Sequence, residues 1–254
     1  MPTWDASLYL KFSDERARPC ADLIARIAID PKDIVDLGCG PGNSTEQLHA
    51  RWPEAKITGV DSSPEMLAVA RKNHPDWSWQ QSDVSSWSPG RTFDLVFSNA
   101  TLHWVKDHAR LLPRLFTFVA AGGALAVQMP QATLSVAHRE MVEVSRLPEW
   151  DAELNVARAT IKNESPASYY DILSPLASHL DIWETTYHLP MDSAEGVLNW
   201  LRGSGMRPYL EALTPEQQAR FQQECLVRFR QAVPQRADGK ILLPYPRIFF
   251  IAYR

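Results

Sequence analysis

Short apolar runs alternate with helical patterns along the first half of the chain. The runs that indicate buried strands occupy residues 34–38, 56–61, 77–83, 93–99 and 123–129. Helical patterns occupy residues 44–51, 62–73 and 108–119. Strands that alternate with helices predict an α/β fold, in which helices lie on both faces of a parallel sheet. Because such sheets bind ligands at the carboxyl ends of their strands, we expect the functional residues to follow the strands directly.

The second half of the chain has a different pattern. Residues 131–168 are polar and helical, and helices that begin at Ser or Thr are expected at 193–205 and 214–229. Strand patterns return only at 181–190 and 247–253. Because these late strands are expected to complete the same sheet, we predict a single domain over residues 1–254. Its expected parts are a lid-like segment at 1–30, a cofactor-binding core at 31–130, a helical substrate cover at 131–180 and 193–235, and the last strands at 181–190 and 247–253.

Three glycines, Gly38, Gly40 and Gly42, follow the first predicted strand in the stretch VDLGCGPGNST. Glycine lets the backbone approach a ligand where a Cβ atom would collide, and the next helix offers unpaired N–H groups at its start. Nicotinamide dinucleotides favour the spacing G-x-G-x-x-G, whereas this chain has G-x-G-x-G behind Asp36. A carboxylate at that place repels a pyrophosphate and attracts an ammonium group. The stretch therefore favours S-adenosylmethionine, with a tight structural turn as the alternative.

Two further acidic residues follow later strands. Asp61 ends the second strand, where a carboxylate can accept hydrogen bonds from both ribose hydroxyls. Asp83 ends the third strand, where a carboxylate can accept from the amino group of adenine. Each residue alone is more often a helix cap. Together with Asp36 they place three acids at successive strand ends, which predicts a nucleoside site.

The stretches VDLGCGPG, GVDSSPEML, QSDV and FDLVFSNATLHWV resemble the successive motifs of class I S-adenosylmethionine-dependent methyltransferases. The resemblance implies a doubly wound, mostly parallel seven-stranded sheet with one antiparallel strand, and a helical cover inserted in the second half. It also implies that S-adenosylmethionine is bound and S-adenosylhomocysteine released. Cys39 is expected to pack rather than to act as a nucleophile. The cofactor-binding residues that the resemblance implies are Asp36, Gly38, Cys39, Gly40, Asp61, Ser62, Asp83, Val84 and Asn99.

The methyl acceptor is expected to be a small molecule. Asn99 is followed by Ala100, Thr101 and Leu102, and not by the Pro-Pro-aromatic loop of enzymes that methylate amino groups of nucleic acids. A net charge of -4 also argues against a nucleic-acid partner. Stretches from WDASLYLKF to ILLPYPRIFFIA resemble a bacterial family of carboxyl methyltransferases. This resemblance implies that a carboxylate of trans-aconitate or of a related polycarboxylic acid is methylated; another small-molecule acceptor is the alternative.

A carboxylate nucleophile is already ionised at neutral pH, so no general base is required. Catalysis then depends on alignment in a site without water, and arginines match the carboxylates that do not react. His103 and Tyr169 are expected to position the reacting groups, and Arg207 is the strongest candidate for binding substrate. The expected substrate-binding residues are Tyr9, Phe12, Arg16, His103, Tyr169, Arg207, Tyr209 and Arg247.

The remaining features concern location and partners. The three cysteines have no metal-binding spacing, so we expect no metal and reduced thiols. The first residues are too polar for a signal peptide, and no apolar run is long enough to cross a membrane. We therefore expect a cytoplasmic protein, a monomer, with no membrane or nucleic-acid partner. A nicotinamide-dependent oxidoreductase and a cofactor-binding protein without catalysis are alternatives from other functional classes.

Overall fold

The computed structural model describes residues 13–161 and 163–254, which gather into two compact units. The first, here called the sheet unit, consists of Arg16–Met129, Glu164–Glu184 and Ile248–Arg254. The second, here called the helical unit, contains Pro130–Asn163 and Thr185–Arg247. Residues 164–180, predicted as part of the helical cover, belong to the sheet unit. The division into lid, core and substrate cover stays a prediction.

Seven strands form one sheet in the order β3-β2-β1-β4-β5-β7-β6. Their bounds are Asp33–Leu37 (β1), Lys56–Asp61 (β2), Ser78–Gln81 (β3), Phe93–Asn99 (β4), Val119–Pro130 (β5), His179–Met191 (β6) and Ile241–Tyr253 (β7). Strand β1 pairs in parallel with both β2 and β4, so the strand order reverses between β1 and β4. Open α/β sheets bind ligands beside such a reversal.

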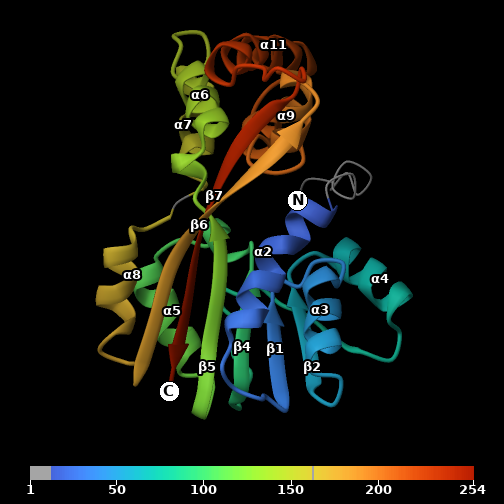
Figure 1. Cartoon of the computed structure of the whole chain (residues 1–254), viewed down its shortest axis with the longest axis vertical. Helices are drawn as coiled ribbons and strands as arrows, with labels where there is room; N and C mark the ends of the chain where they lie inside the picture. The colour runs from blue at the N-terminus through green and yellow to red at the C-terminus, as the bar shows by residue number, and fades with distance from the viewer. Residues whose placement is uncertain (1–12, 162) are drawn as a thin grey trace. The chain divides into compact units, whose positions relative to one another are not determined.

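Strand β7 runs antiparallel to β5 (Figure 1). Arg254, just after β7, exchanges backbone hydrogen bonds with Gly122 and Gly123 near the start of β5, at 3.0 and 2.9 Å. The predicted fold, a doubly wound and mostly parallel seven-stranded sheet, is therefore confirmed. Strand β7 begins six residues before the predicted start at 247, since Pro244 and Pro246 interrupt the apolar pattern there. Proline cannot donate to a strand ladder and so weakens a strand signal.

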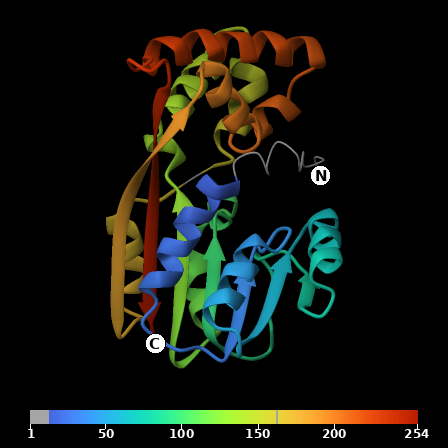
Figure 2. The same ribbon diagram turned by 45° about the vertical axis from the view of Figure 1, so that its right-hand side comes forward.

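Helices connect the strands (Figures 1 and 2), together with short 3-10 turns. In the sheet unit they are α2 (Ser13–Arg26), α3 (Asn43–Arg51), α4 (Pro64–Asn73), η1 (Leu102–Trp104), α5 (His108–Phe116) and α8 (Pro166–Leu173). Helix α5 packs beside α8, and both contribute to one buried cluster with β4, β5 and β7. Strands β1 and β4 are buried along most of their length, which explains their nearly continuous apolar sequences.

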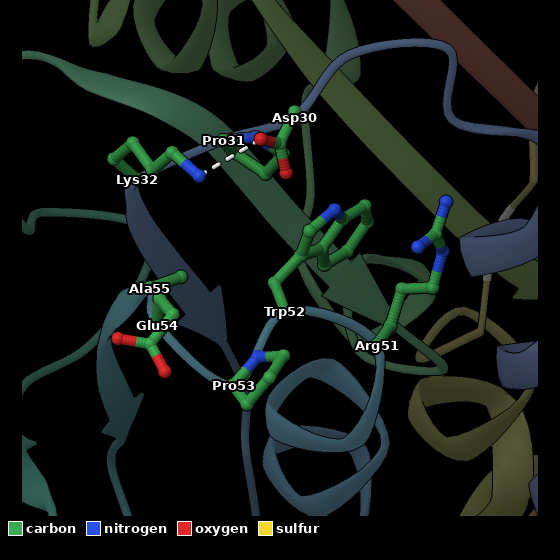
Figure 3. A pocket seen from close by; sticks show the side chains of 8 residues that line it. All are labelled: Asp30, Pro31, Lys32, Arg51, Trp52, Pro53, Glu54 and Ala55. Carbon is green, nitrogen blue, oxygen red and sulfur yellow. Dashed lines mark hydrogen bonds and ion pairs between the residues drawn. The ribbon is translucent and has the colours of Figure 1, made fainter.

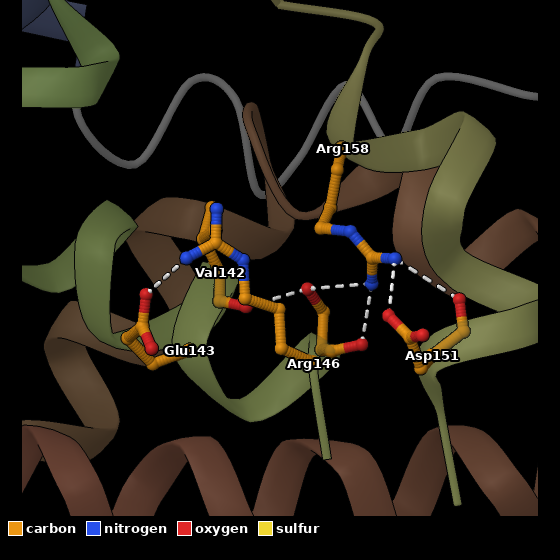
Figure 4. A network of polar contacts seen from close by, with 6 residues as sticks. Val142, Glu143, Arg146, Asp151 and Arg158 are labelled. Carbon is orange, nitrogen blue, oxygen red and sulfur yellow. Dashed lines mark hydrogen bonds and ion pairs between the residues drawn. The ribbon is translucent and has the colours of Figure 1, made fainter. Parts of the chain in front are cut away.

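The helical unit is built around the long helix α11. Its elements are η2 (Ala132–Leu134), α6 (Val136–Ser145), α7 (Asp151–Arg158), α9 (Ala194–Arg202), α10 (Arg207–Glu211) and α11 (Pro215–Ala232). Helix α11 begins at a capping box of Thr214 and Gln217 and packs against α6 and α9. Arg158 of α7 donates to the carbonyl of Ser145 and to the carboxylate of Asp151, which ties α7 to the end of α6 (Figure 4).

The residues that the structure describes include no helix of the length and apolarity needed to cross a membrane.

Candidate active site

The glycine loop follows β1, and each of its glycines has a positive φ. The values are 77° for Gly38, 56° for Gly40 and 105° for Gly42, a region that other residues adopt only with strain. A Cβ at Gly38 would lie 2.1 Å from the Thr101 hydroxyl oxygen, whereas a Cβ at Gly40 would meet nothing within 4 Å. Gly38 is therefore required by packing inside the protein, and Gly40 leaves open space at the end of the strand.

Thr101 links the ends of β1 and β4. Its hydroxyl lies 3.2 Å from the carbonyl oxygen of Gly38 and 3.2 Å from that of Asn99. The residue before it, Ala100, has a φ of 52°, so the backbone at the end of β4 is strained. The sequence did not indicate this role. There, Thr101 was noted only because the residues after Asn99 lack a Pro-Pro-aromatic loop. The only sequence signal was its place just after the fourth strand.

Asp61 links the end of β2 to the glycine loop that follows β1. One carboxylate oxygen accepts from the backbone N–H of Gly40 and the other from that of Ser63, both at 2.9 Å. Each oxygen has two lone pairs, so acceptor capacity for hydroxyl groups is left. The neighbouring Ser62 is exposed, and its carbonyl accepts from the side chain of Gln81. The ribose contacts of Asp61 and Ser62 stay predictions.

Asp36 is completely buried near the end of β1. Its Oδ2 accepts from the hydroxyls of Ser44 at 2.6 Å and Thr45 at 2.8 Å, at the start of α3. Its Oδ1 has no hydrogen-bond partner within the described part of the chain. Burial raises the pKa of Asp36 to about 6, against the two hydroxyl bonds that lower it. An ammonium group suits a buried carboxylate oxygen of this kind and a pyrophosphate does not, so the residues present fit S-adenosylmethionine.

The segment after β3 is held by Arg114 of α5. Its guanidinium donates to the carbonyl oxygens of Val84 and Trp87, and no sequence signal identified it. Asp83 is exposed, and its Oδ1 accepts from the backbone N–H of Ser85 at 2.7 Å. This bond is of the capping kind, which the sequence analysis gave as the alternative to a contact with adenine. The adenine contacts of Asp83 and Val84 stay predictions.

Two more predicted residues lie at the ends of the central strands. Asn99 ends β4, and its buried Oδ1 has no hydrogen-bond partner among the residues described. Cys39 is 3% exposed, and burial raises the pKa of its thiol far above the usual value. A thiol of that kind is not ionised at neutral pH, which agrees with a packing role and not with a nucleophilic one.

Tyr169 contacts a histidine, His108, that the sequence analysis did not identify. His108 bonds through Nδ1 to the hydroxyl of Tyr169 and through Nε2 to the carbonyl of Leu102, both at 2.9 Å. Tyr169 is fully buried, and His103 in η1 is 6% exposed with its ring 4.8 Å from that of Trp104. His108 and Tyr169 thus support the turn that carries His103. The substrate roles of His103 and Tyr169 stay predictions.

Replacement of Tyr169 by Phe distinguishes a structural role of its hydroxyl from a role in binding substrate. We expect a loss of stability of about 1–2 kcal/mol, because His108 and the backbone N–H of Glu164 both lose a buried partner. If the hydroxyl only supports His108 and Glu164, the KM for the expected acid substrate should not change. Urea unfolding and steady-state kinetics measure the two quantities, and Tyr170→Phe is the control, since Tyr170 is 56% exposed. A raised KM at unchanged stability would show instead that the hydroxyl contacts substrate.

The other predicted substrate residues with described side chains belong to the helical unit. Arg207 donates from Nε to Glu211 at 2.8 Å within α10. Tyr209 is 1% exposed, and burial raises the pKa of its hydroxyl to about 12. Arg247 is 3% exposed, with its guanidinium 4.2 Å from the centre of the Tyr245 ring.

Three further predicted features concern the N-terminus and metal binding. Tyr9 and Phe12 lie outside the described residues. The backbone of Arg16 belongs to α2, and its contact with substrate stays a prediction. Within the ranges 13–161 and 163–254, no three His, Cys, Asp or Glu residues form a group that could hold a metal ion.

A shallow hollow of about 160 Å³ lies at the other edge of the sheet (Figure 3). It is found where β1 and β2 begin, whereas the glycine loop follows the end of β1. Charged side chains of both signs line it. This hollow is therefore separate from the candidate cofactor site. Its lining residues are Asp30, Pro31, Lys32, Arg51, Trp52, Pro53, Glu54 and Ala55.

The strand order, the glycine loop and the acids at the strand ends define a class I S-adenosylmethionine-dependent methyltransferase. The profile of a family described as a methyltransferase domain matches residues 34–123. The chain is 46% identical over 255 residues to the trans-aconitate 2-methyltransferase of Azoarcus sp. (strain BH72), covering 100% of both chains. It is 47% identical over 256 residues to that of Methylobacterium nodulans, covering 100% of this chain and 99% of the relative. The chain belongs to the trans-aconitate 2-methyltransferase family.

Solved structures agree with the fold. The YcgJ protein from Bacillus subtilis is similar with a TM-score of 0.60 and 15% identity, covering 93% of this chain and 98% of that one. At this identity the likeness concerns the fold alone. The family profile and the full-length relatives confirm the resemblance to class I methyltransferases that the sequence motifs carry.

Proposed function

We propose that this protein transfers a methyl group from S-adenosylmethionine to one carboxylate of trans-aconitate, which yields a monomethyl ester and S-adenosylhomocysteine. The observation that carries the proposal is the similarity to the trans-aconitate 2-methyltransferases, which extends over the whole chain. It includes the helical unit, outside the part that matches the methyltransferase profile. The acceptor is a small molecule and no metal takes part. A monomeric, cytoplasmic protein stays a prediction.

The residues of the sheet unit hold the methyl donor in this proposal. When bound, S-adenosylmethionine supplies a methyl group on a positively charged sulfur, which a carboxylate oxygen can attack without any proton transfer. Gly40 leaves space for it at the end of β1, and Asp36 offers a buried carboxylate oxygen for its ammonium group. Asp61 fixes Gly40 and keeps acceptor capacity for the ribose.

The acid substrate requires cationic partners rather than a base. Its carboxylates are ionised at neutral pH, so the attacking oxygen is already a nucleophile. Arginine binds a carboxylate bidentately, and Arg207 and Arg247 are assigned to the carboxylates that do not react. A strong contact with the attacking oxygen would reduce its nucleophilicity. The chain therefore contributes alignment and the exclusion of water.

Transfer of a labelled methyl group from S-adenosylmethionine to a panel of acids tests the proposal. We expect trans-aconitate to be preferred over cis-aconitate, citrate and isocitrate. Arg207→Ala should raise the KM for trans-aconitate by about 10–100-fold, as expected for loss of a charge-assisted hydrogen bond, with cofactor affinity unchanged. Arg202→Ala, in the exposed last turn of α9, is the matched control. Cofactor binding without transfer to any acid in the panel would refute the substrate assignment.

A further inference from the structure

Gly205, in the turn between α9 and α10 of the helical unit, lies near two segments that carry buried polar atoms, those of His138 and Asn163. A Cβ on Gly205 would lie 3.4 Å from Cδ2 and 3.8 Å from Nε2 of His138, which belongs to the first turn of α6. The same position is 3.5 Å from the side chain of Ile161, two residues before Asn163. Segments that are far apart in the sequence thus meet at Gly205, two residues before Arg207.

The polar atoms of this group have no internal partners. His138 is 5% exposed, and neither of its ring nitrogens has a hydrogen-bond partner among the residues that the structure describes. The same is true of both amide atoms of Asn163, which are also buried. Native proteins pair nearly all buried polar atoms, because an unpaired one loses its bonds to water without replacement. The N–H donors of His138 and Asn163 thus lack an acceptor among the described residues, which indicates that a bound molecule supplies one.

The chemistry of the group favours an anion. An imidazole and a primary amide both present N–H donors, and the guanidinium of Arg207 follows on the same turn. Burial lowers the pKa of His138 to about 4, so its ring is neutral at pH 7 and donates a single N–H. An apolar ligand would leave the donors of His138 and Asn163 unpaired. A carboxylate accepts from several donors at once.

We infer that His138 and Asn163 donate hydrogen bonds to one non-reacting carboxylate of the acid substrate, beside Arg207. The inference rests on the proposed function and specifies how this acid is distinguished from acids with fewer carboxylates. Neither residue gave a sequence signal, since residues 138–165 contain no motif. His138 and Asn163 are therefore specificity-determining residues that only the folded helical unit identifies.

His138→Leu tests the inference, because Leu fills the buried space without N–H donors. We expect the KM for trans-aconitate to rise by about 10–100-fold, with unchanged affinity for S-adenosylmethionine and no loss of thermal stability. A histidine needed only for folding would give the opposite pattern, a lower stability at unchanged KM. His188→Leu is the matched control, since His188 is an exposed histidine of the same unit.

Acids that lack one carboxylate of trans-aconitate localise the contact. Glutaconate and mesaconate each lack a different carboxylate of trans-aconitate. His138→Leu should raise the KM strongly for the acid that keeps the carboxylate bound by His138, and little for the acid that lacks it. Equal effects on both acids would overturn the inference. Should His138→Leu fail to fold, Asn163→Asp replaces it, since a second carboxylate there repels the substrate and should raise KM by about 10-fold or more.

The two proposals fail in different ways. If the wild-type protein methylates trans-aconitate and both variants retain its KM, the proposed function stands and the roles of His138 and Asn163 are refuted. If the wild-type protein methylates none of the acids, the proposed function itself fails. In that case, binding of trans-aconitate to the complex with S-adenosylhomocysteine, measured by calorimetry for wild type and His138→Leu, still tests the carboxylate site.

Discussion

Asp36→Asn is expected to make the cofactor-free protein more stable at pH 7 while it loses affinity for S-adenosylmethionine by about 100-fold. The stability gain follows from burial, which raises the pKa of this carboxyl from 3.8 to about 6. A shift of that size corresponds to about 3 kcal/mol against the ionised form in the folded state. The Asn oxygen can still accept from Ser44 and Thr45, but its amide group takes the place of an oxygen without a partner. We therefore expect a net gain of about 1–3 kcal/mol.

The pH dependence of unfolding shows whether the Asp36 carboxyl stabilises or destabilises the folded protein at a given pH. The folded protein holds the Asp36 proton more tightly than the unfolded chain, so the contribution of Asp36 to stability is complete below about pH 4. It is lost as the pH rises through about 6, the pKa in the folded state. Urea unfolding between pH 4 and 8 should show the wild type losing stability over this window relative to Asp36→Asn. The exposed Asp76→Asn is the control and should follow the wild type.

Cofactor binding should depend on pH over the same window. An ammonium group beside Asp36 favours the ionised carboxylate, so binding releases a proton and weakens as the pH falls below about 6. In Asp36→Asn the affinity should be low and without this dependence. Calorimetric titration with S-adenosylmethionine at several pH values measures both. Unchanged affinity in Asp36→Asn would mean that Asp36 only anchors α3 through Ser44 and Thr45.

Gly38→Ala is expected to destabilise the protein by about 3–5 kcal/mol, the largest effect on stability in the glycine loop. Three side-chain atoms of Thr101 lie 2.1–2.5 Å from the new Cβ, and the φ of 77° adds backbone strain. Urea unfolding measures the loss. The two contributions separate in a double-mutant cycle with Thr101→Gly, which removes the clash and leaves the strain.

Two other glycines supply matched controls for this experiment. Gly90 has a φ of 66° and Gly40 one of 56°, and a Cβ on either would meet nothing within 4 Å. Each Ala variant should therefore cost only the left-handed strain, about 1–2 kcal/mol. Gly40→Ala should in addition lose affinity for S-adenosylmethionine, whereas Gly90→Ala should not. A Gly38→Ala variant as stable as Gly90→Ala would show that Thr101 moves aside and that packing does not require Gly38.

The cofactor half of the candidate site could be located from the sequence, because its signals are local. The buried strands ending at Leu37 and Asn99 are mostly apolar runs, and their ends define one edge of a parallel sheet. The glycines indicated a special loop after the first strand, and the structure shows that Gly38, Gly40 and Gly42 all have positive φ there. Asp61 lies at the end of its strand, as the sequence pattern predicted, and accepts from Gly40.

Partners far apart in the sequence could not be predicted in this way. Thr101 lies 63 residues from Gly38, and Tyr169 lies 61 residues from His108. Nothing in a residue type identifies which distant group will lie beside it, so the tyrosine could not be assigned to a buried histidine. The same limit applies to Arg114, whose guanidinium holds the segment after β3.

The sequence by itself determined the class of protein and its fold, and it predicted the edge of the sheet at which the cofactor is expected. Those properties depend on the sterics of single residues and on the alternation of apolar and polar positions, which the chain carries without being folded. Only the tertiary structure decided which buried polar atoms, such as Oδ1 of Asp36 and the ring nitrogens of His138, have no partner within the described residues. That property depends on the position of every neighbouring donor and acceptor, and these positions exist only after long-range packing.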